Sequence, residues 1–327
     1  MYDMQTRLKS PPTLSNKQNA NCVVMVPPKE FGYNPQTAQD NEFQHVVDLS
    51  TQQIRQRAMS EYQLMVSGLR AEGVQVIELD YLPSATATPD AVFPNNWFST
   101  TSDGQLFTFP MACENRQQEV RTDELVCTLE ASGRQVEQIQ DLQPNIKQQA
   151  YLESTGVVVA DHVNKTLYAA LSQRCDRAVL EEYAELIDYR RVVSFQTALP
   201  SGNPIYHTNV MMAIGERFCV ICDELIPQFE RSFVLKSLAK DKQIISISLE
   251  QMNAMCGNVL QLETINGQKV IAMSQSAFDA FTPTQRNQLS SHGKLLSFNV
   301  ETIESIGGGS VRCMLAEIFL PSRSRTL

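Results

Sequence analysis

Short apolar runs alternate with longer amphipathic segments along the chain. The runs have the length and the β-branched and aromatic content of strands, and the segments between them carry apolar residues at spacings of three and four, typical of helices. We expect strands at 22–26, 73–79, 90–94, 105–109, 155–161, 166–171, 191–195, 210–214, 218–223, 243–248, 268–274, 295–300 and 310–315. We expect helices near 42–72, 117–132, 174–188, 230–239 and 276–291. Strands outnumber helices, which argues against a doubly wound sheet, where the two alternate one to one.

A strand-strand-helix-strand rhythm recurs about five times along the chain, with about 60 residues in each unit. No exact sequence repeat accompanies the rhythm. It suits a closed, propeller-like α/β arrangement. No Pro/Gly-rich linker or low-complexity tract divides the chain. We therefore expect a polar, mobile N-terminal lead over residues 1–21 and a single domain over residues 22–327.

Composition and charge exclude several classes of partner. The chain has 327 residues, of which 43% are hydrophobic and 19% charged, and its net charge is −9. The lack of a Lys/Arg-rich run argues against nucleic-acid binding. No apolar stretch approaches the ~18 residues that a membrane span needs, and the N-terminal lead lacks the apolar core of a signal peptide. We expect a cytoplasmic protein with neither nucleic acid nor membrane as a partner.

The eight cysteines are expected to be reduced thiols, because no secretion signal accompanies them. They stand at positions 22, 113, 127, 175, 219, 222, 256 and 313. Cys219 and Cys222 have CxxC spacing, but no second pair completes a zinc site. Their surroundings, RFCVICDEL, indicate a buried strand, so core packing is favoured over a metal or redox role. We expect no metal and no cofactor, since the glycine run 307–309 also lacks the phosphate-loop pattern.

Polar residues interrupt strand-like segments at four places. They are the DAVFPNNWFS segment at 90–99, Glu153 in YLESTGVVV, His207 in YHTNVMM and Cys313 in GGGSVRCM. Each has an ordinary explanation taken alone: a turn, a surface acid, a hydrogen-bonded core histidine and a core cysteine. Together, a thiol, an imidazole and a carboxylate are the components of covalent catalysis by a cysteine nucleophile. Arg312 adjoins Cys313, but strand alternation would turn its side chain to the opposite face.

Six motifs, in order, resemble those of the guanidino-group-modifying, or pentein, superfamily, and most closely its citrulline utilisation hydrolase branch. They are DAVFPNNWFST, NRQQEVR, LESTGVVVAD, LSQRCD, YHTNVMM and GGGSVRCM. The resemblance implies a five-bladed α/β propeller of ββαβ-type units with the active site in its central channel. It further implies that Cys313 is the nucleophile, His207 the general acid/base, and Glu153 the carboxylate that holds a substrate nitrogen and assists proton transfer.

The same resemblance implies a small-molecule amino-acid substrate. Arg116 and Arg174 occupy the places of two arginines that clamp the substrate α-carboxylate, a task suited to the rigid guanidinium fork. Asp90 matches an aspartate that holds the amino end of the substrate. Neither residues nor resemblance determine whether the protein forms a homodimer.

The chain departs from arginine deiminases where carboxylates would face the guanidinium group. One such position lies in the Asn95-Asn96 segment, at Asn96, and the other is Asn209. Neutral amides match an uncharged ureido group better than a cation, since an amide can both donate and accept hydrogen bonds. We therefore predict hydrolysis of citrulline to ornithine, ammonia and carbon dioxide.

Three alternatives to citrulline hydrolysis stay open. One is arginine deiminase or dimethylarginine dimethylaminohydrolase activity, because succinylarginine dihydrolases also carry a neutral asparagine here yet start from a guanidino group. The second is a catalytically silent pentein that only binds a ligand. The third is a redox protein that uses Cys219 and Cys222. The complete set of Cys313, His207 and Glu153 favours an enzyme.

Overall fold

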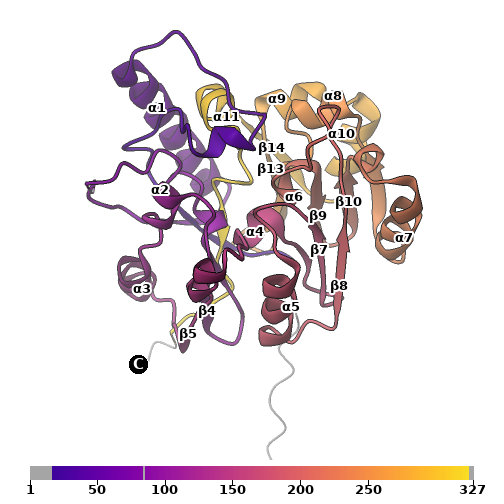
Figure 1. Cartoon of the computed structure of the whole chain (residues 1–327), viewed down its shortest axis with the longest axis horizontal. Coiled ribbons are helices and arrows are strands. Elements are labelled where there is room, and N and C mark those ends of the chain that lie inside the picture. Colours follow the sequence, from indigo (N-terminus) through magenta and orange to yellow (C-terminus); the bar gives the residue numbers. More distant parts are fainter. Residues whose placement is uncertain (1–16, 84, 324–327) are drawn as a thin grey trace, which may run out of the picture.

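The structure, a computed structural model, describes residues 17–83 and 85–323 (Figure 1). Its described strands form five three-stranded sheets. The strands are β1 (Cys22–Met25), β2 (Gln75–Glu78), β3 (Phe98–Thr100), β4 (Gln105–Thr108), β5 (Gln138–Asp141), β6 (Val159–Asp161), β7 (Thr166–Ala170), β8 (Arg191–Phe195), β9 (Met212–Ile214), β10 (Phe218–Ile221), β11 (Gln243–Ser246), β12 (Leu260–Glu263), β13 (Lys269–Ser274), β14 (Lys294–Phe298) and β15 (Ala316–Glu317).

All five sheets share one topology. In each, the central strand pairs antiparallel with one neighbour and parallel with the other, as β4 pairs with β3 and β5. The first sheet takes its antiparallel strand, β15, from the C-terminal part of the chain, so β15 closes the ring of sheets beside β1. This confirms the predicted five-bladed α/β propeller and explains the recurring rhythm in the sequence.

Helices connect the central strand of each sheet to its parallel neighbour and lie on the outside, as α1, α3, α5 and α7 do in Figure 1. The α-helices are α1 (Thr51–Ala71), α2 (Glu114–Gln117), α3 (Thr122–Ala131), α4 (Ser154–Val157), α5 (Arg177–Leu186), α6 (Thr208–Met211), α7 (Gln228–Leu238), α8 (Leu249–Asn253), α9 (Gln275–Ala280), α10 (Pro283–Ser290) and α11 (Glu301–Gly307). The 3-10 helices are η1 (Thr37–Gln39), η2 (Pro94–Asn96), η3 (Gln143–Gln148) and η4 (Asp223–Leu225).

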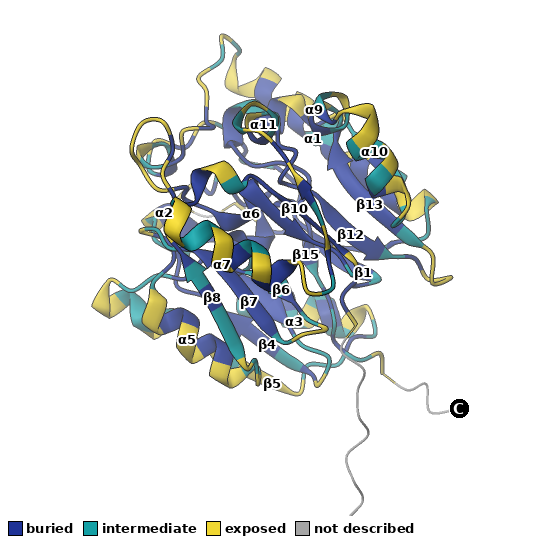
Figure 2. Cartoon of the chain, turned by 90° about the vertical axis from the view of Figure 1, so that its right-hand side faces the viewer, coloured by how far each residue is buried: buried dark blue, intermediate teal, exposed yellow. Residues whose placement is uncertain are grey.

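Local chemistry fixes the start of the long outer helix α1. Ser50 accepts a hydrogen bond from the Gln53 backbone, and the Gln53 side chain accepts one from the Ser50 N–H, which together form a capping box. The apolar residues of α1 recur on one face and are buried, while its other face is exposed. Figure 2 shows the same division on α5 and α7, where exposed faces point away from the buried strands.

The antiparallel strands of neighbouring sheets meet around the centre of the molecule. There β15 lies beside β3, β6 beside β9, and β9 beside β12. The links that lead from one sheet into the next therefore also end at the centre, where α4 contacts η2 and α6. Figure 1 shows α4 and α6 in this central position, in contrast to the outer helices.

Two predicted strands are wrong, and both lie in these central links. Residues 90–94 form turns that continue into η2, with the Phe93 N–H donating to the Asp90 carbonyl. Residues 310–315 form successive turns, because the N–H groups of Cys313 and Met314 both donate to the Ser310 carbonyl. The predicted strands 155–161 and 210–214 each begin with one helical turn, α4 or α6, before the strand starts.

Other differences lie at short or exposed elements. The strands β3, β5, β12 and β15 and the helices α8 and α11 were not predicted from the sequence. The sequence analysis also assigned 17–21 to the mobile lead, yet Gln18 and Asn19 are buried, and the Gln18 side chain donates to the carbonyls of Ala160 and Ile214. Residues 1–16 of that lead lie outside the described residues.

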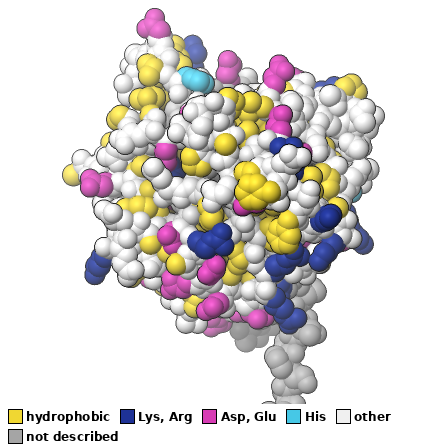
Figure 3. All heavy atoms as spheres, turned by 45° about the vertical axis from the view of Figure 1, so that its right-hand side comes forward, with side chains coloured by type: hydrophobic (Ala, Val, Ile, Leu, Met, Phe, Trp, Pro, Cys, Tyr) yellow, Lys and Arg dark blue, Asp and Glu magenta, His cyan; other side chains and the backbone are white. Residues whose placement is uncertain are grey.

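Cys219 and Cys222 lie in and directly after β10, and both are free thiols buried in the hydrophobic core. In the described part of the chain, no group of three or more His, Cys, Asp and Glu residues could hold a metal ion. None of the described helices combines the length and apolar character that a membrane crossing requires. On the face shown in Figure 3, acidic and basic side chains are interspersed.

Candidate active site

Each of the five links between neighbouring sheets supplies one polar residue to the centre. These residues are Asn96 in η2, Glu153 before α4, His207 before α6, Asn258 between β11 and β12, and Cys313 between β14 and β15. The links are equivalent within the repeat, which is why residues far apart in the sequence meet here. The sequence analysis predicted four of the five and missed Asn258. An asparagine preceding β12 would have been found if the fifth link had been compared with the other four.

Glu153 and His207 form a buried pair. Nε2 of His207 lies 2.6 Å from Oε2 of Glu153, and the Ala112 N–H donates to Oε1. Burial favours a raised pKa for Glu153, but the charge of Arg174 and the hydrogen bond from His207 hold this pKa below its ordinary value. Burial lowers the pKa of His207, and Glu153 opposes that shift only in part. The pair is therefore a carboxylate and a neutral imidazole near neutral pH.

The backbone around Glu153 is adapted to this contact. Ser154 adopts a φ of 41°, a left-handed conformation that costs energy for a residue other than glycine. Its hydroxyl donates to the Phe98 carbonyl, which holds the turn. A Cβ at Gly156 would lie 2.3 Å from Nδ2 of Asn96 and 3.0 Å from the His207 ring, so only glycine fits between these two side chains.

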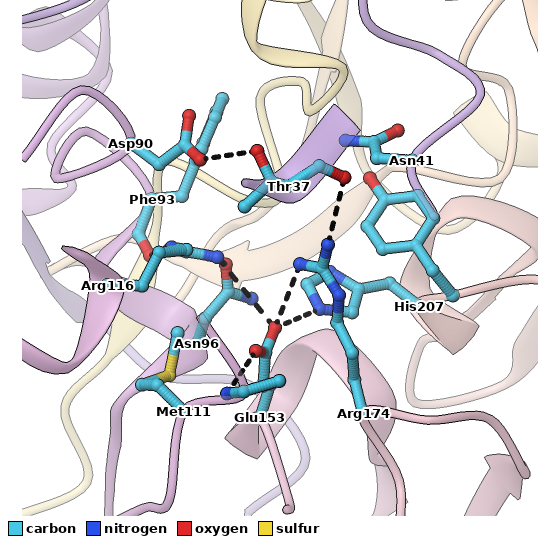
Figure 4. A network of polar contacts seen from close by, with 12 residues as sticks. Thr37, Asn41, Asp90, Phe93, Asn96, Met111, Arg116, Glu153, Arg174 and His207 are labelled. Atoms are coloured by element: carbon cyan, nitrogen blue, oxygen red, sulfur yellow. Dashed lines mark hydrogen bonds and ion pairs between the residues drawn. The ribbon is translucent and has the colours of Figure 1, made fainter. Parts of the chain in front are cut away.

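All three nitrogen atoms of the Arg174 guanidinium group have hydrogen-bond or ion-pair partners. Its Nε donates to Asp40 at 2.8 Å, its Nη2 also contacts Asp40, and its Nη1 donates to Glu153 at 3.3 Å. The guanidinium lies 5.1 Å from the centre of the Tyr206 ring. Figure 4 shows Arg174 beside His207 and Glu153, with a further bond to the Thr37 carbonyl. A substrate carboxylate at Arg174 would have to replace Asp40.

Arg116 lies on the other side of Glu153. Its Nη2 donates to Glu119 at 2.9 Å and its Nη1 to Oδ1 of Asn96 at 2.9 Å, while Nη1 is 3.8 Å from Oε2 of Glu153. Glu119 is buried, and burial raises its pKa to about 7 even though Arg116 opposes the shift. The sequence analysis did not identify Glu119, which orients Arg116.

The two neighbouring asparagines have different surroundings. Asn95 donates through Nδ2 to the Thr155 hydroxyl, and its Oδ1 has no partner. Asn96 accepts from Arg116 through Oδ1, and its Nδ2 has no partner. Both side chains are buried, so unpaired amide atoms here need an explanation. Of the two, Asn96 lines the central cavity.

Cys313 lies in a turn and is buried, with its sulfur beside two amides. Nδ2 of Asn258 donates to Sγ at 3.2 Å, and Nδ2 of Asn209 donates to it at 3.5 Å. Arg312 was expected on the opposite face of a strand; the strand is absent, but its side chain does bond elsewhere, to Glu317 at 3.1 Å. The glycines before Cys313 accommodate the Phe93 ring, since a Cβ at Gly309 would lie 3.0 Å from it.

Residues 34–45, the roof segment, cover the site. Thr37 and Asn34 donate to Oδ2 of Asp90 at 3.0 and 2.7 Å, while Oδ1 of Asp90 has no partner. Burial raises the pKa of Asp90, against the effect of Arg116. Asp40 accepts a hydrogen bond from Arg174, and the side chains of Asn41 and Gln44 donate to the Gly307 carbonyl. These contacts fix the roof segment over the site.

The central cavity is small in this closed arrangement. Cys313, His207, Asn96, Asp90 and both arginines line a volume of ≈ 10 Å³, about the space needed for one water molecule. An amino acid needs more room, so its binding requires the roof segment or adjacent side chains to move. Larger hollows of ≈ 500 and ≈ 560 Å³ lie elsewhere and contain none of the predicted site residues.

Comparison with known proteins defines the class first. The fold is that of the guanidino-group-modifying, or pentein, superfamily. Residues 27–320 match the family model described as N,N dimethylarginine dimethylhydrolase, eukaryotic. The chain belongs to this family, whose members are hydrolases that act on carbon–nitrogen bonds. A search of the curated proteins found no significant match.

Solved structures with low sequence identity share the fold. ArgZ, an arginine dihydrolase from the ornithine-ammonia cycle in cyanobacteria, has a TM-score of 0.67 at 15% identity over 92% of this chain. The match covers 41% of the ArgZ chain, so this chain spans about two fifths of that relative. A substrate-bound mutant of the ArgZ N-terminal domain gives a TM-score of 0.66 at 15% identity, over 90% of this chain and 97% of that one. DDAH from Pseudomonas aeruginosa, a mutant complexed with citrulline, gives 0.62 at 15% identity, over 92% and 100%.

Proposed function

We propose that this protein is a cysteine hydrolase that acts on the ureido carbon of citrulline and yields ornithine, ammonia and carbon dioxide. The observation that carries the proposal is the orientation of Asn96. Asn96 lines the cavity, and Arg116 donates to its Oδ1, which leaves its buried Nδ2 as an unpaired donor. An unsatisfied buried donor costs roughly 1–3 kcal/mol. A ureido oxygen can accept from it, whereas a guanidinium group has only donors.

The surroundings of the sulfur support a neutral reacting group as well. The groups that hydrogen-bond to Sγ of Cys313 are the amides of Asn209 and Asn258, and no carboxylate among the described residues does so. A carboxylate 4 Å from a cation contributes about 4 kcal/mol at an effective dielectric of about 20. Neutral amides do not provide this attraction. Binding of a cationic guanidinium group would benefit from it, whereas binding of a neutral ureido group does not require it.

In the proposed mechanism neutral His207 takes the thiol proton of Cys313, and the resulting thiolate attacks the ureido carbon and forms a tetrahedral intermediate. The carbon–nitrogen bond to the ornithine side chain breaks, and His207 delivers the proton that the departing amine requires. The product on the enzyme is a carbamoyl thioester. Water, deprotonated by His207, adds to its carbonyl carbon and releases the thiolate and carbamate, which decomposes to ammonia and carbon dioxide. Glu153 keeps the imidazole oriented through its 2.6 Å contact with Nε2.

The ends of the amino acid would be held by the remaining predicted residues. Arg174 would bind the α-carboxylate once the roof segment withdraws Asp40, and Arg116 supports the same task from the other side of Glu153. Asp90 would bind the α-amino group through Oδ1, which has no partner in the closed state. Burial disfavours the charged form of the Asp90 carboxyl group, and the positive charge of the bound ammonium group would favour it.

A second candidate is hydrolysis of a guanidino group, with dimethylarginine or arginine as the substrate. The match of residues 27–320 to the N,N dimethylarginine dimethylhydrolase family supports it. This activity uses the same thiolate and the same proton transfers. It differs in the charge of the reacting group, because a guanidinium group is a cation and a ureido group is neutral. The neutral side chains of Asn96 and Asn209 favour the ureido group.

The experiment that tests the proposal is a parallel assay of the purified protein with citrulline, arginine and dimethylarginine. Ornithine, citrulline and ammonia are quantified, and Cys313→Ala is the blank. We expect ornithine and ammonia from citrulline in stoichiometric amounts. Citrulline formed from arginine or dimethylarginine, without turnover of citrulline, would establish the second candidate and overturn the first.

A further inference from the structure

Asn258 reaches the active site through a tightly packed segment, residues 255–258. Met255 adopts a left-handed φ of 63°, and a Cβ at Gly257 would lie 2.1 Å from the Val210 carbonyl oxygen. The backbone of this segment therefore packs directly against α6, the helix that follows His207. Asn258 itself is completely buried. This packing places the fifth link of the propeller beside the nucleophile.

The amide of Asn258 has a defined orientation. Its Oδ1 accepts a hydrogen bond from the Arg312 N–H at 3.0 Å. Its Nδ2 donates to the Asn209 carbonyl at 2.9 Å and to Sγ of Cys313 at 3.2 Å. Exchanging the two amide atoms would place an N–H2 against an N–H and an oxygen against a carbonyl. The group that faces the sulfur is therefore a donor.

We propose that Asn258 stabilises the thiolate form of Cys313 and aims its sulfur at the reacting carbon; this rests on the proposed role of Cys313 as nucleophile. A hydrogen bond from a donor favours the charged form of its acceptor. Asn258 and Asn209 thus form a pair of donors, the amide cradle, around Sγ. The same cradle stabilises the sulfur again when it leaves the carbamoyl thioester.

Other groups around Sγ are charged or titratable, and the test has to separate them from Asn258. The cavity is lined by Asp90, Arg116, Arg174, Tyr206 and His207. None of these accounts for a donor in direct contact with the sulfur, because among the described residues the two asparagines alone hydrogen-bond to Sγ. Removing Asn258 leaves all five groups in place.

The test measures alkylation of Cys313 by iodoacetamide as a function of pH, followed at the peptide level in intact protein. We expect Asn258→Ala to slow the reaction about tenfold at neutral pH, as loss of one hydrogen bond to a charged group implies, and to require higher pH for the same rate. Asn258→Asp keeps the acceptor for Arg312 but turns a negative charge toward the sulfur. We expect a larger effect in the same direction.

A matched control separates this role from support of the fold. Cys256 lies in the same segment, and its thiol donates to the Ala277 carbonyl, away from the site. Cys256→Ala should lower the melting temperature without changing the alkylation of Cys313. If Cys256→Ala slows alkylation as much as Asn258→Ala at the same loss of melting temperature, Asn258 is only structural and the proposal is overturned.

Failure of this inference is distinguishable from failure of the proposed function. If Cys313→Ala abolishes citrulline hydrolysis while the Asn258 variants alkylate normally, only the role of Asn258 is wrong. If Cys313→Ala retains activity, the proposed mechanism itself is wrong. Should the Asn258 variants not fold, a crystal structure of the intact enzyme decides: Nδ2 within hydrogen-bond distance of Sγ supports the proposal, and an amide turned away from Sγ overturns it.

Discussion

Two histidines of this protein make polar ring contacts in contrasting surroundings. His207 contacts the Glu153 carboxylate and shares a cavity with Cys313. His162, in the turn between β6 and β7, contacts the Tyr189 hydroxyl through Nδ1, and its ring packs 4.7 Å from that of Phe319. Burial and, to a smaller extent, Arg312 lower the pKa of His162 to about 4. No described carboxylate opposes that shift.

The comparison shows what turns a buried histidine into a proton carrier. Burial lowers the pKa of both rings, but at His207 a carboxylate works against this effect. The carboxylate also fixes the ring so that Nε2 holds a proton, while Nδ1 has no hydrogen-bond partner among the described residues. His162 lacks both a carboxylate and a neighbouring thiol. The local sequence does not separate the two, because both occur as single histidines beside strands; the resemblance to the pentein motifs is what singled out His207.

The strongest way to break the contrast is Glu153→Gln, which makes the surroundings of His207 resemble those of His162. We expect kcat to fall about 10²–10³-fold, the range typical of an impaired acid/base group. The carboxylate raises the pKa of His207, so its loss lowers this pKa further, and the acid limb of the kcat profile should move to lower pH. A limb that moves to higher pH would contradict the assigned contact.

The double substitution Asn96→Asp and Asn209→Asp exchanges the amides of the cavity for carboxylates. We expect the ratio of kcat/KM for arginine to that for citrulline to rise at least about tenfold, since even a fraction of the Coulomb attraction is worth 1.4 kcal/mol. Substrate competition with the two variants and the wild type measures the ratio. Asn145→Asp, a distant change of the same type, is the control. An unchanged ratio would remove the support that Asn96 gives to a ureido substrate.

Asp40→Asn tests whether Asp40 competes with the substrate α-carboxylate for Arg174. Asp40 occupies Arg174 in the closed state, so a substrate carboxylate has to compete with it. Without that competitor we expect KM for citrulline to fall about three- to tenfold, with kcat changed less, because the Asp40 end of the ion pair is partly exposed and solvent limits its contribution to about 1 kcal/mol. Steady-state kinetics of the variant tests this. A rise in KM would instead mean that Asp40 positions Arg174 for the substrate.

His162→Asn should have the smallest effect on catalysis. The residue contacts Tyr189 and Phe319 and does not line the cavity of Cys313. We expect kcat within about twofold of the wild type and a loss of stability of about 1 kcal/mol, typical of a lost internal contact. Parallel kinetics and thermal unfolding measure both quantities. A large loss of kcat at unchanged stability would show that the contrast between the two histidines is wrong.

The propeller was predictable because its signal is carried by long, regular features. Apolar central strands such as β7 and β10 and the capped, amphipathic α1 are visible in the sequence, and their order repeats. The elements that were missed are short or polar. The strand β5, for example, is mostly exposed and has the sequence QIQD, which shows no apolar alternation.

The links into the centre were predicted least well, and they carry the site. Val157 and Val311 are apolar and buried as they would be in strands, yet they belong to turns that deliver Glu153 and Cys313. Tertiary packing around the axis overrides the local β preference there. The motifs were sufficient to predict most of the site residues. The ion pair between Arg174 and Asp40 and the hydrogen bond from Asn258 to the sulfur could not be predicted, because each joins segments that are far apart in the sequence.

The most direct test of the central claim is to identify the covalent intermediate on Cys313. The enzyme is mixed with citrulline labelled in the ureido carbon, quenched in acid during turnover and analysed by peptide mass spectrometry. The account predicts that the peptide containing Cys313 gains the mass of one labelled carbamoyl group, and that Cys313→Ala gains none. A label that stays in citrulline while an arginine-derived adduct forms on Cys313 in a parallel reaction would contradict the ureido mechanism and establish a guanidino hydrolase.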